Sequence, residues 1–202
     1  MEIKRRTQEE RSAATRDALI SAARKLWGLR GYADVGTPEI AAAAGVTRGA
    51  MYHQFADKAA LFREVVEVVE QDVMARMANV VAASGGTTPA DAIRAAVDAW
   101  LDVSADPEVR QLILLDAPSV LGWADFRDVA QRYSLGMTEQ LLAEAIKAGQ
   151  LARQPTRPLA HVLIGALDEA AMVIATADDP KRLRRETRQV LHRLIDAMFD
   201  AR

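Results

Sequence analysis

Apolar residues recur every three or four positions along almost the whole of this 202-residue chain. The first such run has the spacing of one face of an α-helix: Leu19, Ile20, Ala23, Leu26 and Trp27. No segment shows the apolar–polar alternation that is typical of a half-buried β-strand. Half of the residues are hydrophobic and 27% are charged, which provides enough apolar surface for a substantial core. The sequence therefore predicts an all-α protein.

Capping residues and helix breakers divide the first third of the chain into four helices. Ser12 or Thr15 is expected to cap the first helix, which ends before Gly31. Thr37 and Thr47 are expected to cap two short helices, because a threonine side chain can accept a hydrogen bond from a free amide. A fourth helix is expected from 58 to 83, before the break at 85–89.

Prolines and glycines continue to mark helix ends in the remainder of the chain. Helices are expected at about 90–104, 108–115, 123–148, 158–176 and 180–200. The last two carry long apolar stripes, which two helices cannot bury fully against one thin layer. Pairing across a two-fold axis would bury them, so we expect a homodimer through residues of about 158–200.

Composition excludes several classes of protein. The absence of cysteine rules out disulfide scaffolds, thiol catalysis and cysteine-ligated metal sites. With only three histidines, a histidine-rich metal site is not expected, and we predict no cofactor and no metal. No uncharged apolar run reaches the roughly 18 residues that span a bilayer, and the first residues lack the apolar segment of a signal peptide. We expect a soluble cytoplasmic protein.

Charge is distributed unevenly along the chain, although its net value is only −2. Residues 1–58 contain 10 Lys and Arg against 7 Asp and Glu, whereas residues 59–202 contain 16 against 21. This asymmetry favours a basic N-terminal domain on an acidic body. Residues 4–6, which are Lys-Arg-Arg, form either a flexible arm that follows phosphates or a solvated tail. We place the domains at 1–60 and 61–202.

Two short helices joined by Gly45-Val46 have the dimensions of a helix-turn-helix motif. The residues expected to be buried there are Ile40, Val46, Met51 and Phe55. The second helix then presents Arg48, Gly49, Ala50, Tyr52, His53 and Gln54. Amides, hydroxyls and cations at such a helix start reach DNA phosphates, and an arginine can read guanine in the major groove. The motif therefore predicts binding to double-stranded DNA.

The segment from Ile40 to Phe62, together with Arg30-Gly31-Tyr32, resembles the N-terminal domain of TetR-type transcriptional regulators. The resemblance implies a homodimer with a three-helix DNA-binding domain and a C-terminal helical domain that binds a small effector. It places Thr37, Tyr52, His53 and Lys58 at phosphates, and Thr47, Arg48, Gly49 and Ala50 at the base-facing end of the recognition helix. Val35-Gly36 departs from the paired hydroxyl residues of many members, which puts one phosphate contact in question.

Nine residues in the C-terminal part are candidates for the effector pocket: Trp100, Arg110, Asp116, Trp123, Phe126, Tyr133, His161, Asp168 and Met172. His161 and Asp168 share a stripe on an otherwise apolar helix, where a polar pair needs a partner or water. Two interpretations remain open for this pair. It orients a polar ligand in a pocket, or it sets the register of a dimer interface.

These observations favour a one-component transcriptional regulator, most simply a repressor that a small effector releases from a near-palindromic operator. An all-helical enzyme is the alternative from another class, but the chain lacks any nucleophile, dinucleotide or zinc-protease motif. A nonspecific DNA-packaging protein is disfavoured by the negative net charge. Control by a protein partner in place of a ligand stays open.

Overall fold

The structure is a computed structural model that describes residues 7–200, and no strand occurs in that range. The expected basic arm at residues 4–6 lies outside it. The elements are α1 (Gln8–Arg30), α2 (Thr37–Ala43), α3 (Arg48–Gln54), α4 (Lys58–Ala83), α5 (Pro89–Val103), α6 (Pro107–Val109), the π-helix η1 (Arg110–Asp116), α7 (Ala117–Arg132), α8 (Ser134–Lys147), α9 (Thr156–Ala175) and α10 (Pro180–Asp200). The predicted all-α fold class is confirmed.

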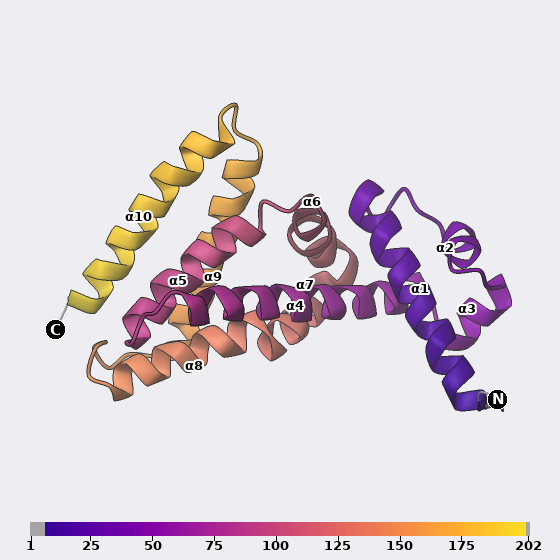
Figure 1. The fold of residues 1–202 in the computed structure, drawn as a ribbon, viewed down its shortest axis with the longest axis horizontal. Coiled ribbons are helices and arrows are strands. Elements are labelled where there is room, and N and C mark those ends of the chain that lie inside the picture. Colours follow the sequence, from indigo (N-terminus) through magenta and orange to yellow (C-terminus); the bar gives the residue numbers. More distant parts are fainter. Residues whose placement is uncertain (1–6, 201–202) are drawn as a thin grey trace, which may run out of the picture.

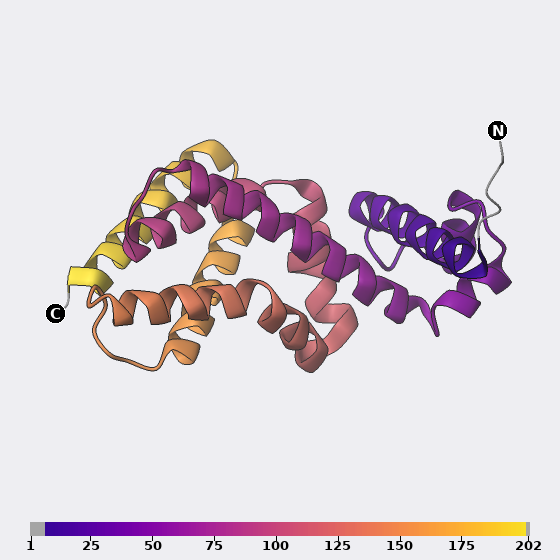
Figure 2. The ribbon, with the colours of Figure 1, turned by 60° about the horizontal axis from the view of Figure 1, so that its bottom comes forward.

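The molecule is elongated, with α1–α3 at one end and the helices from α5 to α10 at the other (Figures 1 and 2). α4 extends from the first group into the second and packs on both α1 and α5. The predicted domain boundary at 60/61 falls inside α4, whose first residue is Lys58. One continuous helix therefore connects the two groups.

α1 begins earlier than the sequence analysis expected. Thr7 is its N-cap, and the Glu10 amide donates to the Thr7 hydroxyl over 3.2 Å while the Thr7 amide donates to Glu10 Oε2 over 2.8 Å. This capping box satisfies two otherwise free amides at once. Ser12 and Thr15 lie inside the helix, so the prediction that one of them caps it was wrong.

The predicted single helix over 123–148 is also wrong, because the backbone breaks at Tyr133 between α7 and α8. This corner is tight. A Cβ atom on Gly136 would lie 2.4 Å from the Gln131 carbonyl oxygen, so only glycine fits there. α7 also has a kink at Gly122, where φ is 74°. Pro118 does not end a helix, because it occupies the first turn of α7, where its missing N–H is not needed.

Three aromatic rings form the centre of the core in the N-terminal part. Phe62 of α4 contacts Trp27 with 5.3 Å between ring centroids and Tyr32 with 4.9 Å, in edge-on geometry. Trp27 and Phe62 have no exposed surface. The same hydrophobic cluster continues along α4 to η1 and α7, while a second cluster joins α5, α8, α9 and α10.

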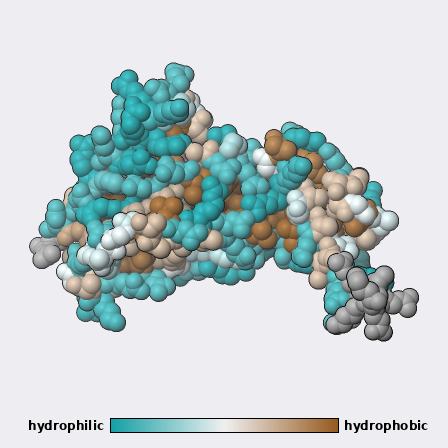
Figure 3. Space-filling model, viewed as in Figure 1, coloured by the Kyte–Doolittle hydropathy of each residue, from teal (hydrophilic) through white to brown (hydrophobic). Residues whose placement is uncertain are grey.

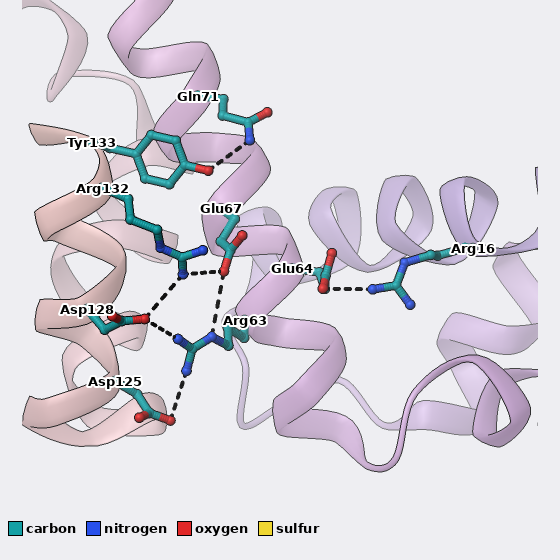
Figure 4. Close-up of polar contacts among 9 residues, drawn as sticks. All are labelled: Arg16, Arg63, Glu64, Glu67, Gln71, Asp125, Asp128, Arg132 and Tyr133. Atoms are coloured by element: carbon teal, nitrogen blue, oxygen red, sulfur yellow. Dashed lines mark hydrogen bonds and ion pairs between the residues drawn. The ribbon is translucent and has the colours of Figure 1, made fainter. Parts of the chain in front are cut away.

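Ion pairs hold α4 to its neighbours on both sides (Figure 4). Arg63 pairs with Asp125 at 3.0 Å and with Asp128 at 2.7 Å, both on α7. Arg132 of α7 pairs with Glu67 of α4 at 2.7 Å. On the other side of α4, Glu64 pairs with Arg16 of α1 at 2.7 Å. Each exposed ion pair alone contributes little to the free energy of unfolding. Together, these pairs fix the rotation of α4 about its axis.

Much of the molecular surface in Figure 3 is hydrophilic, and hydrophobic residues appear mainly in bands between helices. The last two helices are an exception, since they expose large apolar side chains: Val162, Val173, Val190 and Leu194. α9 is the only helix in the described range that is long and apolar enough to cross a membrane, and only 22% of that stretch is buried. Exposed apolar faces of this kind are typical of surfaces that bind other molecules.

Phe62→Ala should lower the free energy of unfolding by about 3–5 kcal/mol, because it removes a buried ring that contacts two other rings. Urea denaturation followed by circular dichroism measures this loss. Leu29→Ala is the matched truncation at a side chain that is 75% exposed, and it should change stability by less than about 0.5 kcal/mol. Equal effects of the two substitutions would contradict the assignment of Phe62 to the core.

Candidate DNA-binding surface and ligand cavity

α2 and α3 form a helix-turn-helix unit whose inner faces are closed by apolar residues. Ile40 and Met51 have no exposed surface, and Phe55 is 3% exposed, as expected, while Val46 is half-buried. Thr47 caps α3 as predicted, accepting a hydrogen bond from the Ala50 amide over 3.1 Å. The N-terminal end of α3 is therefore held at a fixed angle to the rest of the domain.

The outer face of α3 carries the residues that the sequence placed on DNA. Arg48, Gly49 and His53 are exposed, Ala50 is half-buried, and Tyr52 is 42% exposed. The Arg48 guanidinium lies 5.6 Å from the centroid of the Tyr52 ring. No acidic side chain contacts Arg48 in the described residues, so its charge is available to an anionic partner.

Tyr52 connects α3 to the start of α2. Its hydroxyl lies 3.2 Å from the Thr37 hydroxyl, and the Thr37 contact, together with the nearby Arg48 guanidinium, lowers the pKa of Tyr52. Thr37 is 8% exposed, and Gly36 is the N-cap of α2 in its place, so the predicted cap was wrong. Thr37 instead orients the tyrosine.

Lys58 has an intramolecular role. Its ammonium donates to the Tyr32 carbonyl over 2.6 Å and lies 3.9 Å from the centroid of the Tyr32 ring. Burial lowers the pKa of Lys58. The amino group thus connects the start of α4 to the loop after α1.

α1 supports the helix-turn-helix unit from behind. Arg16 donates to the Gln54 carbonyl at the end of α3 over 3.2 Å, and the Gln54 amide donates to the Ser12 hydroxyl over 2.8 Å. Arg30 forms two hydrogen bonds to Glu39 of α2, at 2.7 and 2.9 Å. These bonds hold the C-terminal end of α3 and the first turn of α2 against α1, which is the preorganisation that groove recognition needs.

Two family models match this chain. The description "Bacterial regulatory proteins, tetR family" matches residues 19–65, and "Tetracyclin repressor-like, C-terminal domain" matches residues 90–198. The second match covers more than half of the chain. The chain belongs to the TetR family of transcriptional regulators.

Individual relatives agree with this assignment. A TetR-family transcriptional regulator from Pectobacterium atrosepticum has 30% identity and a TM-score of 0.78, over 96% of this chain and 98% of that one. The HTH-type transcriptional regulator AcrR of Shigella flexneri is 41% identical over 69 residues, which are 34% of this chain and 32% of that protein. The structure of RolR in complex with resorcinol has the same fold, with 20% identity and a TM-score of 0.71 over 93% of this chain and 90% of that one.

The C-terminal domain of this TetR-family regulator contains a cavity of about 300 Å³. Its walls come from α4, α5, η1, α7, α8, α9 and α10, and they are mostly aliphatic, aromatic and methionine side chains. Of the nine predicted effector residues, Trp100, Phe126 and Asp168 line it. This volume lies at the lower end of the range for small-molecule sites. The cavity therefore suits a compact ligand.

The other six predicted residues lie elsewhere. Arg110 lines a second cavity of about 210 Å³ between α5, α9 and α10. Asp116 accepts a hydrogen bond from the Tyr32 amide over 2.8 Å, and the Tyr133 hydroxyl lies 2.8 Å from Gln71 Nε2. Trp123 is 69% exposed. The remaining two, His161 and Met172, are half-buried on α9 and are not part of the wall of the larger cavity.

Sequence reasoning missed two charged residues of the cavity wall, Glu70 and Arg127. Glu70 is 4% exposed, and burial, assisted by the charge of Asp168, raises its pKa to about 7. Burial raises the pKa of Asp168 to about 6, against the effect of Arg127. The sequence did indicate that Glu70 is buried, because this glutamate interrupts the apolar stripe of α4 between Val69 and Val73.

The DNA-binding end contacts the C-terminal domain through α1. Arg24 forms two hydrogen bonds to Glu108 of α6, at 2.9 and 2.8 Å, and a third to Asp72 of α4. Glu108, followed by Asp72, raises the pKa of Arg24 further above its usual range. Asp116, at the end of η1, holds the loop at Tyr32. η1 therefore contacts the DNA-binding end and, through Ile113, the cavity.

Glu70→Gln should make the protein more stable at pH 8 by about 1–3 kcal/mol, with the difference vanishing below about pH 4. The folded-state pKa of about 7 exceeds the ordinary value of 4.5. Between these values the folded protein therefore binds more protons at Glu70 than the unfolded chain, and stability falls as pH rises. Denaturation at a series of pH values tests this. Glu67→Gln, three residues away in the α4–α7 ion pairs, should not reproduce the pH dependence.

Proposed function

We propose that this TetR-family regulator is a one-component repressor, which a small molecule bound in the C-terminal cavity releases from its operator. One observation carries the proposal: the chain combines a rigidly supported, exposed recognition helix with a cavity, and one π-helix contacts both the cavity and the DNA-binding end. It would act in the cytoplasm without a cofactor, and it is not an enzyme. TetR-family regulators bind operator DNA, and many bind small ligands.

On the DNA, we assign phosphate contacts to Tyr52 and His53, with Thr37 holding the tyrosine in place. The base-facing group is the start of α3, which is Thr47, Arg48, Gly49 and Ala50. Small residues at two of these positions let the backbone approach the groove, and Arg48 supplies the bidentate donor that guanine accepts. The Lys58 ammonium donates one hydrogen bond to the Tyr32 carbonyl and has two further N–H donors, so we also assign it to a phosphate.

Dimerisation would bury the exposed apolar face of α9 and α10, and TetR-family proteins are dimers. A two-fold dimer presents two copies of α3, and these read a near-palindromic operator when they are about 34–36 Å apart. Ligand binding favours a protein state with a different separation and so weakens the operator complex. The loss of operator-binding free energy can be no larger than the difference in the ligand's binding free energy between the two states.

The cavity and the DNA-binding end are coupled through one short element. Ile113 lies in the cavity wall and Asp116, three residues later on η1, holds the Tyr32 amide. A ligand that moves η1 therefore moves the loop between α1 and α2. π-Helices are rare and occur frequently at functional sites, which agrees with this role.

A selected-operator binding assay with purified protein tests the proposal. We expect a discrete protein–DNA complex that is much tighter than the complex with random duplex, and its release by some member of a metabolite and drug library. Equal affinity for all duplexes would contradict sequence-specific regulation. Tight operator binding that only another protein relieves would instead favour control by a partner.

Arg48→Ala should weaken operator binding by roughly 1–3 kcal/mol per half-site and relax the preference at one base pair, because it removes a bidentate contact to a base. Tyr52→Phe should weaken operator and random DNA together, because a phosphate has the same charge at every sequence. Titrations on operator and substituted duplexes at several salt concentrations separate the two effects.

Arg153→Ala is the control for the lost charge, because Arg153 is exposed in the loop between α8 and α9, far from α3. It should leave base preference unchanged. An unaltered base preference in Arg48→Ala would reassign Arg48 to a phosphate contact. Unchanged affinity in both α3 variants would mean that α3 does not enter the groove.

Val173→Glu should weaken the dimer by at least about tenfold, because it places a charge in the apolar face of α9. Sedimentation velocity across a concentration series measures the dissociation. Val80→Glu is a matched control on α4, since Val80 is 45% exposed and Val173 is 47% exposed. A dimer that is equally stable in both variants would exclude this face as the interface.

A further inference from the structure

The cavity wall contains three charged side chains, and each comes from a different helix. Glu70 is on α4, Arg127 on α7 and Asp168 on α9. Ser134 and Thr138 add two hydroxyl groups, and every other side chain in the wall is apolar. Three methionines belong to this apolar part, and such side chains adapt to ligands of different outline: Met74, Met77 and Met137. The distribution of charge, rather than the shape, therefore constrains what the cavity can recognise.

Glu70 is the least explained of these groups. It is 4% exposed, yet its carboxylate has no hydrogen bond or ion pair within the described part of the chain. Asp168 is also without such a partner there, and it lies close enough to Glu70 to raise the pKa of that carboxyl. A buried carboxylate normally has a hydrogen-bonding or ionic partner, because its desolvation is costly. The structure thus presents two acidic groups to an apolar space without a cation between them.

Arg127 does not provide that cation. Its guanidinium carbon lies 4.2 Å from the Trp123 ring centroid and 5.4 Å from that of Phe126. Its Nε atom is buried without a hydrogen-bond partner, and no ion pair joins it to Glu70 or Asp168 within residues 7–200. Its charge acts on Asp168 only through space, lowering the pKa of that group. With both carboxylates ionised, the three side chains sum to one negative charge.

We propose that the cavity binds a compact, mainly apolar primary amine in its protonated form, with the ammonium group between Glu70 and Asp168. This inference rests on the proposed function, because it assumes that the cavity is the effector site. An ammonium has three N–H donors and supplies both the missing charge and the missing hydrogen bonds. Trp100 and Phe126 in the same wall can add cation–π attraction.

Competing ligand chemistries satisfy this wall less well. A carboxylic acid would bring a third anionic group towards Glu70 and Asp168, with only Arg127 to oppose them. A neutral alcohol would donate one hydrogen bond and leave the other carboxylate without a partner. A purely apolar ligand would desolvate both carboxylates and compensate neither. The cation alone provides a partner for both acidic groups.

A matched set of three probes tests the proposal: 4-phenylbutylamine, 4-phenylbutanol and 4-phenylbutyric acid. They share one apolar body and differ in the charge of the terminal group. Isothermal titration calorimetry with the full chain at pH 7.5 should show the amine binding at least about tenfold tighter than the alcohol, with the acid weakest. Equal affinity of amine and alcohol, a preference for the acid, or no binding of any probe at millimolar concentration would overturn the proposal.

Two conservative variants locate the recognition. Glu70→Gln and Asp168→Asn keep side-chain size, and each should reduce the advantage of the amine over the alcohol by about tenfold while alcohol binding changes little. Glu67→Gln, on the same helix but paired with Arg132 outside the cavity, should retain the full advantage. An undiminished advantage in both cavity variants would place the amine elsewhere. If a folded cavity variant loses affinity for the amine and the alcohol equally, the substituted residue has only a packing role.

Operator binding by the same preparations separates this inference from the proposed function. If the amine fails to bind while the operator complex forms and another library member releases it, only the ligand class is wrong. If no ligand of any charge releases a tight operator complex, the proposed function itself fails.

Discussion

The packing of α4 against both ends of the molecule is the constraint on which the remaining structure depends. Its apolar stripe supplies Phe62 to the aromatic cluster of the DNA-binding end and Met77 to the cavity wall. Its polar faces pair with α1 through Glu64 and with α7 through Arg63 and Glu67. Because α4 is one continuous helix of 26 residues, both ends of the molecule pack on the same element. The DNA-binding end and the cavity therefore share one core, and no flexible linker separates the two ends.

The DNA-binding end contrasts with the cavity in how its polar groups are satisfied. Around α3, the Gln54 carbonyl, the Tyr52 hydroxyl and the Glu39 carboxylate all have protein partners, so the exposed guanidinium of Arg48 stands on a rigid support. In the cavity, Glu70 lacks any such partner in the described range. The first arrangement reduces the ordering cost of binding DNA. The second leaves binding energy available for a ligand that supplies the missing groups.

The sequence predicted local structure well where the signal is local. Thr47 and the Gly45-Val46 turn fix the helix-turn-helix unit, and the buried and exposed faces of α3 follow from a 3.6-residue period. Tertiary contacts were less accessible. The break at Tyr133 depends on the close approach of Gly136 to the Gln131 carbonyl, and Asp116 leaves the cavity because it binds the Tyr32 amide, 84 positions away. Only three of nine expected effector residues line the cavity, since periodicity gives the buried face of a helix but not which void it borders.

The burial of Glu70 also bears on how long the protein survives in a cell. An ionised carboxylate without a partner makes the ligand-free form less stable, and a bound cation would remove that penalty. Proteases act mainly on transiently opened molecules, so a difference of one or two kcal/mol changes steady-state abundance several-fold. Since the pKa of Glu70 is about 7, a modest rise in the surrounding pH above 7 would increase the fraction of empty molecules that are transiently unfolded. If the cavity holds the proposed cation, occupied molecules would accumulate while empty ones are degraded, and turnover would then be a second readout of ligand supply.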